Sequence, residues 1–307
     1  MSGLFKGSPR KSAVRRLWCT PILKSLYSQL GRKYFYLGFP GPEASDIKTW
    51  KDMIGRICAF ECPTAGDDPK AAITKLENEL NNLKISSDID FMTYYGLLEQ
   101  VMIWGKDING ERYSQDELVT LYQLDFCHAF TSTIQNGNKN YRYDAVRKLI
   151  THQCNCDLDE KKRPFVMFLT VRDEIHSEQF LSFFNKERKS TDKQIIQQIL
   201  DNYKIDNSRQ LYVKHPILKP FVFTIMRKYF EGNNIRSLFM PPVYYVGNNK
   251  RDNMVLFCIL GTFDLSSLDA PNSIQSLNDY ISTQGFELKD KTLNPVRRCK
   301  LESISMK

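Results

Sequence analysis

The fold of this chain is indicated first by one stretch, Lys33-Tyr34-Phe35-Tyr36-Leu37-Gly38-Phe39-Pro40-Gly41-Pro42-Glu43-Ala44-Ser45-Asp46-Ile47. After Lys33, residues 34–38 form an apolar run that predicts a short strand at about 33–38, and this strand ends in a loop of glycine and proline. We expect a helix to begin at Ser45 or Asp46 and a second apolar strand to cover residues 56–61, ending at Glu61. The predicted order is strand, glycine loop, helix, and strand with a terminal acid.

This order is typical of the unit that opens a nucleotide-binding α/β fold. Gly38 and Gly41 allow a tight turn and the close approach of a ligand to the backbone. The N–H groups of the following helix favour an anion or a polar ligand. Glu61 lies 23 residues after Gly38, near the spacing of about 20 residues at which an acid binds ribose hydroxyls. The alternative interpretation is an ordinary turn between strand and helix, with Glu61 on the surface.

The composition indicates a soluble globular protein. The 307 residues are 42% hydrophobic and 25% charged, which allows one large domain or two small ones. No apolar run approaches 18 residues, so we expect no membrane span, and residues 1–16 lack the apolar core of a signal peptide. Three of the eight cysteines, Cys58, Cys127 and Cys258, lie in strand-like runs. We therefore expect reduced thiols and a cytoplasmic protein.

The positive charge is concentrated at the N-terminus. The net charge is +8, and residues 1–42 contain eight lysines and arginines without a single acid, so the other 265 residues are balanced. This basic arm predicts contact with the phosphates of a nucleic acid. A solvated tail and a docking segment for an acidic protein partner are the alternatives. Within the arm we expect residues 1–14 to be flexible and residues 13–30 to form a helix around Pro21.

Further strands and helices alternate along the chain. Asp125 closes one strong candidate strand, and its position at a carboxyl end predicts that it faces a ligand crevice; a helix cap or turn is the alternative. Residues 97–104 fit either a strand or a helix. Pro241 and Pro242 confine their strand to a sheet edge or a bulge. The later strands are expected at residues 91–95, 120–127, 163–171, 237–246 and 254–263, with the last two forming an antiparallel hairpin.

Five strands alternating with helices, followed by a hairpin, resemble the class I S-adenosylmethionine-dependent methyltransferases. The resemblance covers residues 31–265 and implies an α/β fold, with a doubly wound, mostly parallel sheet and a terminal antiparallel hairpin. It implies that Gly38 and Gly41 match the first cofactor motif and that Glu61 binds the ribose. It also implies a catalytic position for Asp125 near the methyl-transfer centre, and an adenine contact for which Asp107 is the candidate.

These observations predict three segments: a basic arm with a lead-in helix (1–30), a methyltransferase-like domain (31–265) and a C-terminal tail that is polar and weakly helical (266–307). The leading hypothesis is an S-adenosylmethionine-dependent enzyme that acts on a macromolecule, with nucleic acid as the favoured acceptor. The competing hypothesis is a non-catalytic methyltransferase-like module that binds nucleic acid or protein. An enzyme using another nucleotide is a third interpretation. His152, Cys154 and Cys156 are too closely spaced for a typical zinc site, so we expect no metal.

Overall fold

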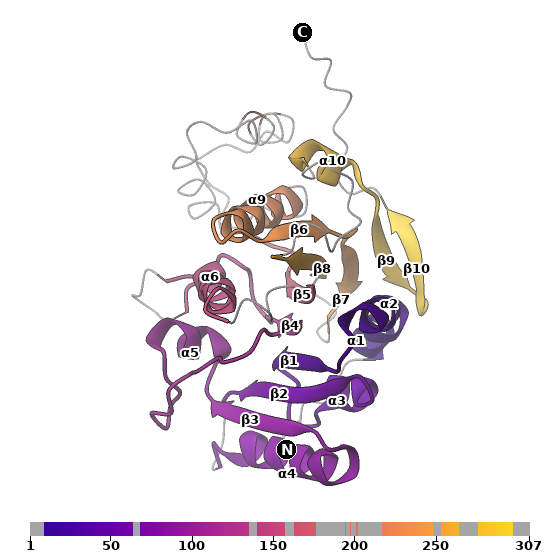
Figure 1. The fold of residues 1–307 in the computed structure, drawn as a ribbon. Helices are drawn as coiled ribbons and strands as arrows, with labels where there is room; N and C mark the ends of the chain where they lie inside the picture. The colour runs from indigo at the N-terminus through magenta and orange to yellow at the C-terminus, as the bar shows by residue number, and fades with distance from the viewer. Residues whose placement is uncertain are drawn as a thin grey trace.

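The computed structural model describes residues 9–63, 68–134, 140–156, 163–175, 217–247, 253–263 and 276–296, with isolated positions 194, 197 and 201. One mixed sheet with helices on both faces accounts for most of these residues (Figure 1). The expected doubly wound α/β architecture is therefore confirmed. Within the described ranges no helix is both long enough and apolar enough to cross a bilayer.

The central sheet has the strand order β10-β9-β7-β8-β5-β4-β1-β2-β3, and β6 also pairs with β8. The strands are β1 (Tyr34–Gly38), β2 (Ile54–Glu61), β3 (Asp90–Tyr95), β4 (Leu121–Asp125), β5 (Phe165–Arg172), β6 (Arg236–Phe239), β7 (Val243–Val246), β8 (Asn253–Thr262), β9 (Gly285–Lys289) and β10 (Thr292–Val296). Strands β1 to β5 are parallel, whereas β8 runs antiparallel to β5 and to β7. The predicted terminal antiparallel pair is thus present.

The helices connect and cover these strands. They are α1 (Pro9–Val14), the π-helical turn η1 (Arg15–Cys19), α2 (Thr20–Leu30), α3 (Ser45–Trp50), α4 (Ala71–Ser87), α5 (Leu98–Trp104), α6 (Arg142–Gln153), α9 (Leu218–Glu231) and α10 (Leu277–Ser282). The ambiguous segment 97–104 is therefore helical. The two helices expected between β5 and Pro216 fall outside the described residues, apart from the three isolated positions.

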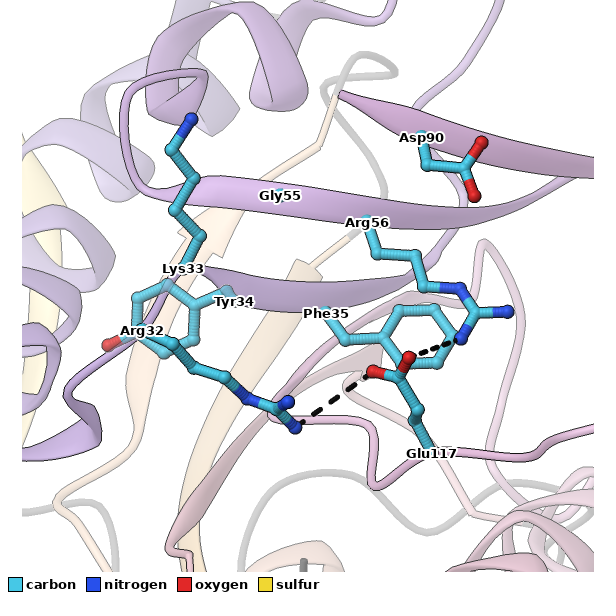
Figure 2. Close-up of a pocket in the computed structure, with 8 residues that line it drawn as sticks. All are labelled: Arg32, Lys33, Tyr34, Phe35, Gly55, Arg56, Asp90 and Glu117. Carbon is cyan, nitrogen blue, oxygen red and sulfur yellow. Dashed lines mark hydrogen bonds and ion pairs between the residues drawn. The ribbon is translucent and has the colours of Figure 1, made fainter. Parts of the chain in front are cut away.

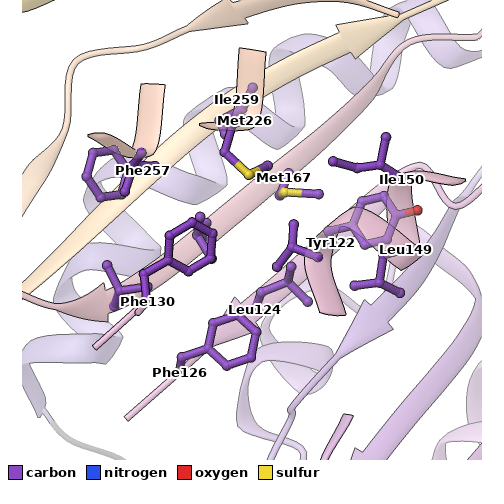
Figure 3. Packing of buried hydrophobic residues seen from close by; sticks show 14 of the residues in the cluster. Tyr122, Leu124, Phe126, Phe130, Leu149, Ile150, Met167, Met226, Phe257 and Ile259 are labelled. Atoms are coloured by element: carbon purple, nitrogen blue, oxygen red, sulfur yellow. The ribbon is translucent and has the colours of Figure 1, made fainter. Parts of the chain in front are cut away.

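Alternation along the strands divides the core into two layers. In β1, Tyr34 and Tyr36 belong to the layer beneath α1 to α4, whereas Phe35 and Leu37 belong to the layer beneath α5, α6, α9 and α10. Successive strand residues point to opposite faces, so an apolar strand supplies both layers at once. Figure 3 shows the second layer, where side chains of β4, β5 and β8 meet those of α6 and α9.

The N-terminal arm differs from its prediction. Residues 9–14, expected to be flexible, form α1, which continues through η1 into α2. Pro21 lies in the first turn of α2, where its missing amide hydrogen is tolerated. Apolar residues of the three segments, among them Val14, Leu23 and Leu26, are buried against the sheet. This burial outweighs the polar sequence of the arm and holds α1, η1 and α2 on the sheet.

Two parts of the C-terminal half also depart from expectation. The strand predicted over residues 237–246 is divided at Pro241 and Pro242 into β6 and β7, which both pair with β8. Proline has no amide hydrogen for a ladder bond, so the strand is interrupted there. The tail, expected to be polar and weakly helical, contains α10 and the hairpin β9–β10, and β9 extends the sheet beside β7. Strand β7 is therefore not at the sheet edge.

Candidate functional site

The carboxyl ends of β1, β2 and β4 meet where the strand order reverses. Gly38, the last residue of β1, is in register with Ala59 of β2 and Gln123 of β4. Glu61 and Asp125 each lie two residues further along their strands, so both extend on the same face as Ala59 and Gln123. With strands about 4.8 Å apart, their backbones are separated by about 10 Å across the loop after β1. Open α/β sheets bind ligands at such a reversal point.

Glu61 is partly buried at the end of β2. Its Oε1 accepts a hydrogen bond from the amide of Cys62 at 3.1 Å, and no described residue pairs with Oε2. Burial raises the pKa of the Glu61 carboxyl above its ordinary value, although the hydrogen bonds from Cys62 oppose this effect. One carboxylate oxygen therefore remains available to a hydroxyl donor.

Asp125 closes β4 and makes a contact across 114 residues of chain. Its Oδ2 accepts a hydrogen bond from Nζ of Lys11 at 2.7 Å, and the two side chains are 10% and 20% exposed, respectively. Its other oxygen, Oδ1, is buried and has no partner among the described residues, and the same is true of Oε1 of Gln123. Buried acceptors without donors are uncommon, and they fit a ligand that brings N–H or O–H groups.

A second ion pair lies beside the first. Arg15 approaches Asp46 at 3.8 Å, and Asp46 is fully buried at the start of α3. Asp46 also accepts hydrogen bonds from the hydroxyl of Tyr36 at 2.9 Å and from the amide of Ile47 at 3.1 Å. Sequence reasoning missed Lys11, Arg15, Tyr36 and Asp46 as members of the site. The excess of positive charge in residues 1–42 was the only sequence feature that pointed to these contacts, and it does not identify the acids that pair with Lys11 and Arg15.

The two glycines of the loop after β1 have different structural causes. A Cβ added to Gly38 would lie 2.2 Å from the carbonyl oxygen of Gln123, so this glycine permits β1 and β4 to approach each other. Gly41 has a φ of +69°, in the left-handed region, and its Cβ position is open. The structure thus explains Gly38 by packing and Gly41 by the turn.

Few amides of this loop are free for a ligand. The amide of Phe39 donates to Gln123, and that of Ala44 donates to Gly41. Pro40 and Pro42 have no amide hydrogen. Helix α3, which follows, has only six residues. Ligand binding by this loop stays a prediction, and it would depend on the shape of the loop more than on its hydrogen-bond donors.

Asp107 lies beyond the end of β3 and is buried. Its Oδ2 accepts from the amide of Tyr95 at 3.0 Å, and its Oδ1 accepts from the amide of Glu111 at 2.9 Å. Both bonds hold the connection after α5 against β3. Asp107 also lines a cavity of about 260 Å³ between α4 and β3, together with Lys70 and Thr93. Strands β1 and β2 separate β3, beside which Asp107 lies, from β4, which ends at Asp125.

The larger of the two described cavities, about 530 Å³, lies at the opposite, amino edge of the sheet (Figure 2). Arg56 pairs there with Glu117 at 2.8 Å, and its guanidinium lies 4.9 Å from the centre of the Phe35 ring. Arg32 approaches the same glutamate at 3.9 Å. The acidic and basic side chains of this open groove largely neutralise one another, and the groove is remote from Glu61 and Asp125.

The described residues contain no cluster of three or more metal-ligating side chains. The thiol of Cys154 donates to Oδ1 of Asn233 at 3.2 Å, and His152 packs edge-on against Tyr113 with ring centres 5.0 Å apart. Burial lowers the pKa of His152, with a further contribution from the charge of Lys148. The His152–Cys156 segment therefore has packing and hydrogen-bonding roles.

The strand order decides the fold. From β3 to β5 it follows the doubly wound order 3-2-1-4-5, and antiparallel β8 is inserted between β5 and β7. This chain has a class I methyltransferase-like fold. The methyltransferase-like sheet differs from the expected one in its additional hairpin β9–β10.

Solved structures with this fold resemble the chain only distantly. A putative sarcosine dimethylglycine methyltransferase from Galdieria sulphuraria has a TM-score of 0.40 and 10% identity, covering 86% of this chain and 91% of that one. The 1,6-didemethyltoxoflavin-N1-methyltransferase of Burkholderia thailandensis, solved with S-adenosylhomocysteine, has a TM-score of 0.38 and 11% identity, covering 82% and 79%. Magnesium protoporphyrin IX methyltransferase from Synechocystis PCC 6803 has a TM-score of 0.33 and 8% identity, covering 83% and 88%.

No family model matches the sequence, and no curated protein matches it. Similarity at the level of these structures carries no information about ligand or substrate. The methyltransferase-like assignment therefore rests on the observed order and direction of the strands, and it concerns the fold alone.

Proposed function

We propose that this methyltransferase-like protein binds S-adenosylmethionine at the carboxyl edge of its sheet, between the Gly38–Gly41 loop, Glu61 and Asp125. One observation carries the proposal: two partly buried carboxylates flank the loop after β1 at the reversal point, and each keeps an oxygen without a partner in the described part of the chain. Ligands of doubly wound sheets bind at this place.

Each polar residue at the carboxyl edge would make a different contact with the cofactor or the acceptor. Glu61 would accept hydrogen bonds from the ribose hydroxyls, and Gln123 would accept one from an N–H group. S-adenosylmethionine supplies a methyl group on a positively charged sulfur when it is bound. Asp125 would accept a hydrogen bond from the acceptor nucleophile and hold it in line for transfer, so its contribution is positioning. Asp107, which lies beyond the end of β3, would contact the adenine.

A macromolecular acceptor, with nucleic acid favoured, is supported by charge at the surface of the N-terminal helices. Arg10, Arg16 and Lys24 are exposed, and none has an ion-pair partner among the described residues. Unpaired cations on one segment attract phosphates and release counterions when they bind. An acidic protein surface is the alternative partner for the same cations.

Calorimetric titration with S-adenosylmethionine and S-adenosylhomocysteine tests the cofactor proposal. We expect saturable binding to the wild type and at least a tenfold loss in Glu61→Ala. Glu117→Ala is the matched control, because it makes the same change at the opposite edge of the sheet, beside Arg56. Absence of binding at about 1 mM, which corresponds to a binding free energy weaker than about −4 kcal/mol, would refute the proposal for a protein that is demonstrably folded.

The second candidate function is a non-catalytic methyltransferase-like module, and the loop after β1 favours it. Four of its six positions from Phe39 to Ala44 offer a ligand no amide hydrogen, because two are prolines and two already donate within the chain. If the titration detects no cofactor, this candidate takes precedence. The next experiment is then direct binding of RNA, DNA and acidic peptides to the full chain, with Arg10, Arg16 and Lys24 replaced by glutamine for comparison.

A further inference from the structure

The chain's own N-terminal helices contact the proposed cofactor site through two cations. Lys11 of α1 donates to Asp125 at 2.7 Å, and Arg15, the first residue of η1, lies 3.8 Å from Asp46. Asp125 ends β4, whereas Asp46 lies in the first turn of α3, so the two cations bridge segments on both sides of the loop after β1. Figure 1 shows α1 and α2 beside β1, on the side of the sheet where α3 also lies.

We propose that residues 9–16, here called the latch, close this site, and that Lys11 must leave Asp125 before a cationic cofactor enters. This inference rests on the proposed function and adds its regulation. The ammonium group of Lys11 neutralises the charge of a carboxylate that is 10% exposed, while Oδ1 of this carboxylate remains without a partner among the described residues. A partly desolvated carboxylate is costly without a cation, so Lys11 and the positively charged sulfur of S-adenosylmethionine compete for the negative charge of Asp125.

The latch is attached differently from the helix that follows it. Its buried apolar residues are Ala13 and Val14, whereas α2 buries Leu23, Leu26 and Leu30. Its two inward-facing polar side chains are the cations of the ion pairs. Removal of one ion pair therefore removes a large fraction of the contacts that hold the latch on the domain, whereas the buried leucines of α2 are unaffected.

We place the hinge of the latch at the junction of the two parts. The turn η1 is π-helical, and π turns inside helices are frequent at functional sites. Pro21 follows in the first turn of α2. Trp50 donates a hydrogen bond to Thr20 at 2.9 Å, which fixes the chain immediately beyond η1. Motion of the latch can thus end within η1, before Thr20, without disturbing α2.

Cys19 provides a reporter for opening. It is fully buried one helical turn after Arg15, on the same inward side, and burial raises the pKa of its thiol. Cys258, 1% exposed in β8, reports unfolding of the whole domain. We would measure the labelling rates of both thiols by peptide mass spectrometry in the full chain and in three variants. Lys11→Met removes the charge, Lys11→Arg preserves it, and Lys33→Met removes an exposed, unpaired lysine elsewhere.

We expect Lys11→Met to accelerate labelling of Cys19 at least tenfold while Cys258 remains protected. Lys11→Arg and Lys33→Met should leave both rates near those of the wild type. Unchanged labelling of Cys19 in Lys11→Met would overturn the latch. Faster labelling of both cysteines would also overturn it, because Lys11 would then support the whole domain and not a local closure.

Titration of the same variants tests competition. Lys11→Met should bind S-adenosylmethionine at least tenfold more tightly than the wild type, with a smaller gain for S-adenosylhomocysteine, whose sulfur is uncharged. Equal or weaker binding in Lys11→Met would overturn the gating step. If neither protein binds either compound, the proposed function fails and the gating step fails with it, whereas the Cys19 rates still decide whether Lys11 holds the latch.

Discussion

Arg142 and Glu99 form a buried ion pair that joins α6 to α5, with Nε of the arginine 3.0 Å from Oε1 of the glutamate. Both residues are buried, and Oε2 of Glu99 has no partner among the described residues. Such a pair contributes little net stability compared with apolar residues, but removal of one member leaves a buried charge unpaired. The pair therefore makes the α5–α6 contact sensitive to single substitutions.

Arg142→Met should lower the free energy of unfolding by about 3–5 kcal/mol, whereas the double variant Glu99→Leu/Arg142→Met should recover most of the loss. Urea denaturation of the two single variants and the double variant measures this coupling. Arg147→Met is the control on the same helix, because Arg147 pairs with Asp144 at the surface; it should cost no more than about 1 kcal/mol. A small effect of Arg142→Met would mean that Glu99 becomes hydrated or protonated when unpaired.

The two glycines of the loop after β1 should differ in what they tolerate. Gly38→Ala places a Cβ against the Gln123 carbonyl oxygen and should cost at least about 1–3 kcal/mol, because two strand backbones must separate. Gly41→Ala meets no atom within 4 Å and should cost about 1–2 kcal/mol through its left-handed φ alone.

Asparagine separates these two causes. Asn adopts the left-handed region more readily than alanine, so Gly41→Asn should be less destabilising than Gly41→Ala. Gly38→Asn should be no better than Gly38→Ala, since steric overlap and not φ is limiting there. Denaturant midpoints of the four variants make the comparison. A benefit of asparagine at position 38 would contradict the packing explanation.

Glu61 should make stability depend on pH. Its pKa in the folded chain is raised by burial, so the folded state holds its proton more tightly than the unfolded state does. The resulting stability is present below the ordinary glutamate pKa and is lost as the pH rises through the raised value. Glu61→Gln should therefore gain stability relative to the wild type across this interval, as measured by denaturation from about pH 4 to about pH 8. Parallel curves for the two proteins would show that Glu61 is solvated like a surface residue.

The strands were predictable because they are apolar on both faces. Residues 33–38, 56–61 and 163–171 are nearly continuous apolar runs, as expected of strands buried between two helical layers. Their order along the chain then restricts the topology, since parallel strands joined by helices have few arrangements. The antiparallel β8 followed from the short polar turn before it.

The site was less predictable because its contacts are distant in sequence and polar. Lys11 and Asp125 are 114 positions apart, and nothing local in either segment identifies the other. A run of basic residues has the same appearance whether it is solvated or paired with buried acids. The hairpin β9–β10 was missed for a related reason: its strands have five residues each, and β10 is mostly exposed, so its pattern resembles that of a loop.

The exposed cations of the N-terminal helices should determine the salt dependence of nucleic acid binding. Arg10, Arg16 and Lys24 are exposed and have no ion-pair partner within the described chain. If each contacts one phosphate, replacing all three by glutamine should reduce the slope of log K against log salt by about 2–3.

Fluorescence anisotropy with a labelled single-stranded RNA, repeated from low to moderate salt, measures that slope for the proposed nucleic acid interaction. The matched control replaces Lys106, Arg112 and Lys148 by glutamine; these exposed cations belong to the α5–β4 connection and to α6, on the other side of the sheet. The control should keep the wild-type slope. Equal losses in both triple variants would mean that binding follows the net charge of the protein, and it would remove the N-terminal helices as a specific contact surface.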